Sequence, residues 1–240
     1  MLTDSIRDTQ EKANLFCTAT VFYIVAFVFG EFMKEYRTVE FENCDEFIEK
    51  KSRFIGYVKP VKTAEEATQF INSIKSKHWD ATHNVSAYVL RENNIQRSSD
   101  DGEPSGTAGV PVLDVLLKEN LVDLCVVVTR YFGGTLLGAG GLIRAYSHAS
   151  KLAVNSGKII TMAPCKILCC SIDYSFFDRF NILINDMGAN IENTEFADSI
   201  SITFTIKAQL KDELSRKLTE ISNGKYTVTE VGEKFAKINE

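Results

Sequence analysis

The stretch TRYFGGTLLGAGGLIR at residues 129–144 lies where a strand-like segment gives way to a helix-like one. Five of the chain's 14 glycines fall within residues 133–141. The preceding run, VDLCVVVT at 122–129, is apolar like a strand buried on both faces, and residues 141–154 have the pattern of a helix. The sequence therefore predicts a glycine-rich connection leading into a helix N-terminus, and function is sought there first.

This glycine run matches neither standard nucleotide-binding fingerprint. A P-loop continues from its last glycine into Lys and then Ser or Thr, but here Leu142 follows the last glycine. The dinucleotide pattern GxGxxG begins at Gly138 and is broken at Ile143. We therefore reject both a P-loop and a dinucleotide-binding fold.

An anion site at this position still has physical support. Glycines let a ligand approach the backbone, and the free N–H groups at the start of a helix attract negative charge. Arg130 and Arg144 stand on either side of the run and could flank a phosphate. In the alternative interpretation the glycines only permit tight packing, and Arg130 pairs with Asp100 or Asp101.

Two polar segments precede the run. The acidic turn SDDGEP at 99–104 carries three carboxylates, which could bind Mg²⁺ or transfer protons, although charged turns of this kind are common on surfaces. HWDATHN at 78–84 contains two histidines, an acid and the chain's one tryptophan. Trp79 could stack on a base, but a packing role is the commoner one. Neither segment has the ligand spacing of a metal site, so no metal, cofactor or catalytic residue is assigned.

The residues from 34 to 157 predict one α/β domain. Strands are expected at 38–41 and 53–61, joined by a polar connection at 42–51. A helix should begin after Thr63, because Glu66 stands at capping-box spacing. Residues 84–90 and 95–98 predict a hairpin, and Pro111 fits the first turn of another helix.

The residues from 158 to 240 predict a second domain. Strands are expected at 166–174, 190–196, 200–207 and 226–231, and helices at 176–187 and 210–221. This β-α-β-β-α-β order is that of a ferredoxin-like fold. The chain as a whole is expected to be α+β.

Composition limits the classes of partner and the compartment. A net charge of −5 and a pI near 5.4 argue against a broadly basic nucleic-acid binder, but leave room for a local basic patch. The six cysteines have no CxxC pairing, which favours a reducing, cytoplasmic location.

Residues 1–33 differ from the rest of the chain. LFCTATVFYIVAFVF at 15–29 is almost wholly apolar, yet shorter than the roughly 20 residues that a membrane span needs. We interpret this extension as a start placed too far upstream, with Met33 as the first residue. A membrane anchor and a terminal helix packed on the body are the alternatives.

Three separated motifs resemble the IMPACT/YigZ family: HWDATHN at 78–84, DDGEPSGTAG at 100–109, and VVVTRYFGG at 126–134 followed by LGAGGLIRAY at 137–146. The resemblance covers residues 34 to about 230 and is of the two-domain bacterial type. It implies an N-terminal two-layer α/β domain of the type shared with a small-subunit ribosomal protein and domain IV of elongation factor G. The family's eukaryotic members regulate translation by competing for a ribosome-associated activator of the amino-acid-starvation kinase, and nucleic-acid or ribosome binding is the proposed role of the bacterial ones.

By position, the resemblance also implies a functional surface. Its candidates for phosphate or nucleic-acid contact are Arg130, Tyr131, Gly133, Gly134, Gly140, Gly141 and Arg144. Its supporting candidates are Arg53, His78, Asp80, His83, Asp100, Asp101 and Glu103. Val85 stands where cysteine is common in the family, which excludes a catalytic thiol at that position.

The function predicted from these features is regulation of translation or of a stress response, through binding to RNA or the ribosome and without chemistry. Two alternatives stay open. One is a small enzyme that acts on a phosphorylated substrate, and the other is a module that binds a translation-associated protein.

Overall fold

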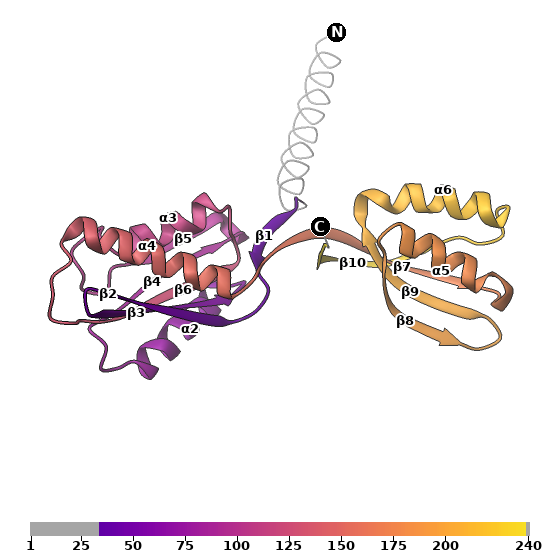
Figure 1. The fold of residues 1–240 in the computed structure, drawn as a ribbon. Helices are drawn as coiled ribbons and strands as arrows, with labels where there is room; N and C mark the ends of the chain where they lie inside the picture. Colours follow the sequence, from indigo (N-terminus) through magenta and orange to yellow (C-terminus); the bar gives the residue numbers. More distant parts are fainter. Residues whose placement is uncertain (1–33, 239–240) are drawn as a thin grey trace, which may run out of the picture. The chain divides into compact units, whose positions relative to one another are not determined.

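A computed structural model describes residues 34–238. The start-site, anchor and terminal-helix interpretations of residues 1–33 lie outside the described residues. Two compact units are present, one formed by Tyr36–Met162 with the C-terminal end of the chain, and one formed by Ala163–Ala236 with residues 34 and 35 (Figure 1). Within residues 34–238, no helix combines the length and the apolar character needed to cross a bilayer.

The first unit is built on an antiparallel five-stranded sheet. Its strand order is β2 (Asn43–Glu49), β3 (Ser52–Pro60), β6 (Leu124–Tyr131), β4 (His83–Leu90) and β5 (Ile95–Ser99). The central strand β6 is buried along all but its last residue, as its apolar sequence predicts. Near its end, Arg130 pairs with Phe54 on one neighbouring strand and His83 on the other.

Helices cover both faces of this sheet (Figure 1). One face packs against α3 (Gly109–Lys118) and α4 (Ala139–Ser156), and the other packs against α2 (Ala64–Lys77). The predicted N-cap of α2 is confirmed, since Thr63 Oγ1 accepts a hydrogen bond from Glu66 N at 3.2 Å, while the Glu66 carboxylate accepts from Lys62 N at 2.7 Å, one residue before the cap. The α2 layer is an addition to the expected two layers.

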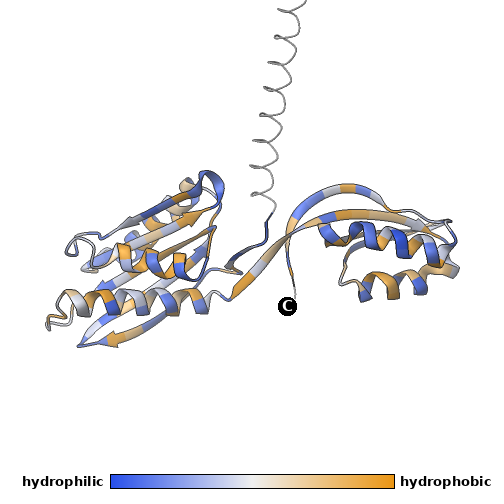
Figure 2. Cartoon of the chain, turned by 90° about the horizontal axis from the view of Figure 1, so that it is seen from above, coloured by the Kyte–Doolittle hydropathy of each residue, from blue (hydrophilic) through white to orange (hydrophobic). Residues whose placement is uncertain are grey.

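The second unit has the ferredoxin-like arrangement. Along the chain it contains β7 (Ile159–Ile172), α5 (Phe177–Asp186), β8 (Asn190–Phe196), β9 (Ile200–Lys207), α6 (Lys211–Ser222) and β10 (Thr229–Lys237). The strands lie in the order β10, β7, β9, β8, and the α+β class is thereby confirmed. In both units, apolar and polar residues occupy different sides of the helices (Figure 2), as expected for helices with one face on a sheet.

Four short elements complete the described part of the chain. β1 (Tyr36–Val39) pairs antiparallel with Ile159–Met162, the first residues of β7. The 3₁₀ turns are η1 (Glu92–Asn94), η2 (Tyr174–Phe176) and η3 (Ala208–Leu210).

The polar connection predicted for residues 42–51 is wrong, because most of it forms the edge strand β2. Six of the strand's seven residues are exposed, so no apolar alternation marks it in the sequence. Lys50 and Lys51 then form the two-residue turn into β3, with φ of 47° and 68°. Two-residue hairpins with positive φ at both positions usually carry Asn-Gly, so two lysines give no turn signal.

Candidate functional site

The glycine loop, residues 132–138, is locked against the lysine turn, Lys50 and Lys51. A Cβ on Gly133 would lie 2.0 Å from the carbonyl carbon of Lys51 and 2.1 Å from its oxygen, so no larger residue fits without a backbone shift. Gly133 N also donates to Ser52 Oγ at 3.2 Å. This close approach is the reason that position 133 requires glycine, and it holds the glycine loop beside the lysine turn.

Helix α4 begins at the end of the glycine loop with an open N-terminus. Gly138 is the N-cap residue at φ 71°, and no side chain caps the helix. Leu142 N is the first amide bonded along the helix, to Gly138 O at 2.9 Å. The amides of Ala139, Gly140 and Gly141 therefore have no acceptor within the helix, and the start of an 18-residue helix carries partial positive charge.

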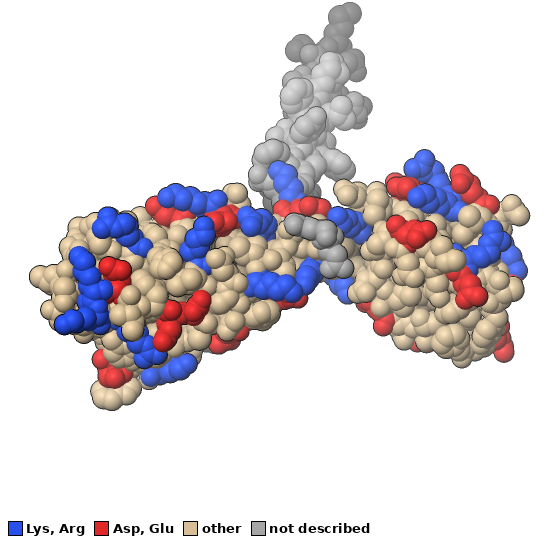
Figure 3. Space-filling view, in the orientation of Figure 1, with Lys and Arg blue, Asp and Glu red and all other residues tan. Residues whose placement is uncertain are grey.

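Lys50 and Arg144 lie beside this helix start, and Glu49 lines the same cavity. Arg144 folds back along α4, so that its Nη1 lies 3.6 Å from the place where Gly140 would carry a Cβ. A cavity of about 260 Å³ lies between Lys50 and Arg144, with Phe47 and His148 in its wall. We call Lys50, Lys51, the glycine loop, the first turn of α4 and Arg144 the basic tip. Lys and Arg side chains gather at the corresponding end of the first unit in Figure 3.

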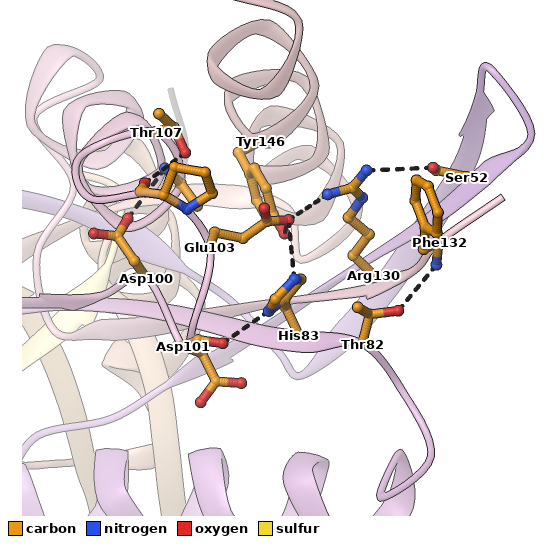
Figure 4. A network of polar contacts seen from close by, with 12 residues as sticks. Ser52, Thr82, His83, Asp100, Asp101, Glu103, Thr107, Arg130, Phe132 and Tyr146 are labelled. Atoms are coloured by element: carbon orange, nitrogen blue, oxygen red, sulfur yellow. Dashed lines mark hydrogen bonds and ion pairs between the residues drawn. The ribbon is translucent and has the colours of Figure 1, made fainter. Parts of the chain in front are cut away.

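Arg130 lies inside the unit rather than on the basic tip. Its Nη1 donates to Glu103 Oε1 at 2.5 Å, and the Tyr146 hydroxyl donates to the same oxygen at 2.8 Å (Figure 4). The Arg130 and Glu103 side chains are only 6% and 3% exposed. Burial and the adjacent Glu103 carboxylate raise the pKa of Tyr146 far above its usual value, so this hydroxyl stays a donor. The partner proposed for Arg130 in the packing alternative, Asp100 or Asp101, is corrected to Glu103.

The two aspartates of the acidic turn hold the backbone. Asp100 accepts from the amides of Gly106, Ala108 and Gly109 at 2.7–3.1 Å and so caps α3. Burial opposes its ionisation, but these donors outweigh burial and lower the pKa of Asp100 below its usual 3.8.

Asp101 connects three segments of the first unit. Its carboxylate accepts from Lys75 Nζ at 2.6 Å and from Asn84 N at 2.7 Å. Its carbonyl accepts from His83 Nδ1 at 2.9 Å, which turns His83 Nε2 toward Glu103 Oε1 at 3.8 Å (Figure 4). The acidic turn is therefore held against the sheet, and each of its three carboxylates has a structural contact.

A second polar chain runs through His78 on the α2 side of the sheet. Tyr131 OH donates to Asp80 Oδ1 at 3.1 Å and lies 2.8 Å from His78 Nδ1, while His78 Nε2 lies 2.6 Å from Tyr57 OH. Burial lowers the pKa of His78, so a neutral ring that donates to Tyr131 and accepts from Tyr57 is favoured. Arg53 lies at the surface and pairs with Glu46 at 2.6 Å.

Eleven of the fourteen predicted residues fall into three groups, while Asp100 and Asp101 hold the acidic turn and Arg53 pairs with Glu46 at the surface. Gly133, Gly134, Gly140, Gly141 and Arg144 lie on the basic tip; His83, Glu103 and Arg130 form the buried network; His78, Asp80 and Tyr131 form the His78 chain. Sequence reasoning missed Lys50, Lys51, Ser52 and Tyr146. Of these, only the two adjacent lysines carry a signal in the sequence, which is their paired positive charge just before a strand. Among residues 34–238, no three His, Cys, Asp or Glu side chains are grouped as a metal site would require.

Comparisons with known proteins agree with the family resemblance. A model described as the Impact N-terminal domain matches residues 50–154, and one described as a domain of unknown function (DUF1949) matches residues 170–225. The IMPACT family member YvyE of Bacillus subtilis is 40% identical over 199 residues, which are 82% of this chain and 92% of YvyE. This chain belongs to the IMPACT family.

Two further similarities support this assignment. The IMPACT family member YigZ of Escherichia coli is 32% identical over 178 residues, which are 73% of this chain and 87% of YigZ. A crystal structure described as that of a hypothetical protein aligns with a TM-score of 0.53 at 28% identity, covering 83% of this chain and 98% of that one. The two-domain, bacterial-type membership predicted from the motifs is confirmed.

Proposed function

We propose that this IMPACT family protein regulates translation or a stress response by binding ribosomal or other structured RNA through the basic tip. In this proposal the α4 amides, the two lysines of the lysine turn and Arg144 contact backbone phosphates. Arg130 supports the tip from inside without touching the ligand. The family's eukaryotic members, which act in translation control, support the regulatory part of the proposal.

The observation that carries the proposal is the exposed, uncapped start of α4 beside Lys50 and Arg144, with Lys51 next to the glycine loop. Backbone amides at a helix start bind phosphate oxygens, and the helix dipole adds to the attraction. Gly134 and Gly138 have positive φ and open space around the Cβ position, so no neighbouring atoms crowd the backbone there, while the Leu137 side chain lies against Gly141.

The lysine turn gives additional support. Left-handed backbone disfavours a non-glycine residue by about 1–2 kcal/mol, and here two lysines adopt it in succession. Asn-Gly would form the same turn with less strain. Two cations are thus kept at a position where they weaken the fold, as expected if their charge is used in binding.

Ribosome co-sedimentation at two salt concentrations tests the proposal. The variant Lys50→Asn with Lys51→Gly removes both charges and creates the favoured turn sequence, so the fold should be at least as stable as the wild type. We expect weaker sedimentation and a salt dependence whose log–log slope is smaller by about 1–2. Arg144→Gln should act in the same direction.

A matched control distinguishes the loss of charge at the basic tip from an equal change in the net charge of the protein. Lys62 and Lys118 are also exposed; Lys62 follows the end of β3 that is opposite the lysine turn, and Lys118 is the last residue of α3. Lys62→Gln with Lys118→Gln changes net charge equally and should leave sedimentation near the wild-type level. Equal sedimentation of the tip variant, the control and the wild type would refute the proposal.

The enzyme alternative gains no support from the geometry. It needs an acid or base from Asp100, Asp101 or His83, but the two aspartates are engaged with the α3 amides and Lys75, and His83 donates to the Asp101 carbonyl.

A further inference from the structure

Trp79 is the most exposed large hydrophobic residue in the described part of the chain, with 84% of its surface accessible. It is also the chain's one tryptophan. The packing role that the sequence favours for it is therefore wrong. Scattered exposed apolar residues are ordinary, so exposure alone assigns no function to this side chain.

The loop that carries Trp79 is held in place on both sides. The preceding residue, His78, has both ring nitrogens within 2.8 Å of tyrosine hydroxyls, and the following residue, Asp80, accepts from Tyr131 OH at 3.1 Å. The His78 carbonyl accepts from Ala81 N at 3.1 Å and from Asn84 Nδ2 at 3.3 Å. The backbone around Trp79 is thus fixed, while the indole projects into solvent.

This loop is also tied to the glycine loop. Phe132 N donates to Thr82 Oγ1 at 3.1 Å (Figure 4). Thr82 N donates to the Arg130 carbonyl at 2.9 Å. Phe132, the first residue of the glycine loop, is itself 46% exposed. The basic tip therefore has an exposed aromatic residue of its own where it meets the Trp79 loop.

Cations accompany these aromatic residues. Lys77 ends α2 two residues before Trp79, and its Nζ lies 4.9 Å from the Tyr57 ring centroid. Arg53 pairs in register with Tyr131, and its partner Glu46 is an exposed carboxylate. Such exposed ion pairs contribute little to stability, so Arg53 can exchange Glu46 for a phosphate.

We propose that the Trp79 loop and the basic tip together bind single-stranded RNA, with a base stacked on Trp79 and backbone phosphates on Lys77, Arg53 and the tip. Exposed aromatic rings beside cations suit single strands, because a duplex hides the faces of its bases. This inference rests on the proposed function and specifies that the same surface takes an unpaired segment of the RNA.

Trp79 fluorescence provides a direct test, because no other tryptophan contributes emission. The full chain is titrated with a short oligouridylate, with an RNA hairpin duplex of equal phosphate number, and with polyphosphate. Stacking should quench Trp79 with the oligouridylate and leave its emission nearly unchanged with the other two. Quenching by all three probes to the same extent, or by none, would overturn the stacking inference.

Affinity for labelled oligouridylate, measured by anisotropy, gives the second readout. Trp79→Ala should weaken binding about 5- to 150-fold, Trp79→Phe should restore part of it, and hairpin binding should change little. Phe196→Ala, which removes an aromatic residue that is 62% exposed on the second unit, is the matched control and should have no effect. Unchanged oligouridylate affinity in Trp79→Ala would overturn the inference.

The proposed function and the single-strand inference can fail independently of each other. If lysine-turn variants lose ribosome sedimentation while Trp79→Ala keeps it and no probe quenches Trp79, phosphate contact stands and single-strand stacking is refuted. If Trp79→Ala loses sedimentation while oligouridylate neither binds nor quenches, Trp79 contacts protein, which also refutes the inference.

Discussion

Replacing Arg130 with methionine should damage the fold rather than remove a ligand contact. The change leaves the Glu103 carboxylate, whose side chain is 3% exposed, without the guanidinium 2.5 Å away. Removing one partner of a buried ion pair costs about 3–5 kcal/mol, because the remaining charge stays out of water without compensation. A typical domain has a folding free energy of about 5–15 kcal/mol, so this loss would be a large fraction of it.

Urea unfolding followed by far-ultraviolet circular dichroism measures the loss. Trp79 emission is a poor reporter here, since the indole is already 84% exposed in the folded state. With a slope of about 2 kcal/mol per molar urea, the transition of the first unit should move down by about 1.5–2.5 M in Arg130→Met. Arg144→Met removes an exposed arginine and should change stability by less than about 0.5 kcal/mol.

A double variant tests whether the isolated charge causes the loss. In Arg130→Met with Glu103→Gln, the amide oxygen still accepts from Tyr146 but carries no charge. We expect the double variant to recover at least half of the unfolding free energy that Arg130→Met loses. Equal effects of Arg130→Met and Arg144→Met, or a double variant less stable than Arg130→Met alone, would refute the buried-pair explanation.

Two further predictions concern the glycines and His78. Gly133→Ala should lower the thermal midpoint, because its Cβ would overlap the Lys51 carbonyl, while Gly140→Ala should raise stability by up to about 1 kcal/mol, because alanine is the better helix former. A midpoint for Gly133→Ala at or above that of Gly140→Ala would contradict this. The folded-state pKa of His78 is lowered from 6.5, so its contribution to stability is present above pH 6.5 and is lost as pH falls through the lowered value. The stability advantage of wild type over His78→Gln should therefore shrink from about pH 7 to about pH 5, and a constant difference would contradict it.

Most of the fold could be predicted because its elements have clear local patterns. β9 was expected at residues 200–207 and lies there, and the capping residues Thr63 and Glu66 mark the start of α2. The edge strand β2 could not be predicted, because six of its seven residues are exposed and only Phe47 packs on the core, so apolar alternation is absent. The lysine turn was missed for a related reason: its shape comes from the pairing of β2 with β3 rather than from turn-forming residues.

The candidate site was predicted less well, because side-chain direction on a central strand depends on the tertiary structure. β6 is buried on both faces, so period-two alternation does not show that Arg130 points into the core. Trp79 presents the same difficulty, since a residue just past a helix end can pack inward or project outward. In its case the hydrogen bonds of His78 and Asp80 decide the direction.

Arg130 and Arg144 flank the same glycine run but have opposite environments, and this difference determines how the site must be tested. Arg130 joins β6 to the acidic turn through Glu103 and to α4 through the oxygen shared with Tyr146, so it holds the segment from which the glycine loop departs. Arg144 is exposed and turned toward the helix start. Removing both arginines together would lose binding whether or not either one meets a phosphate, because the scaffold would loosen. Only changes at Arg144 and the lysine turn, which leave the buried network intact, separate the loss of a ligand contact from the loss of the structure that presents it.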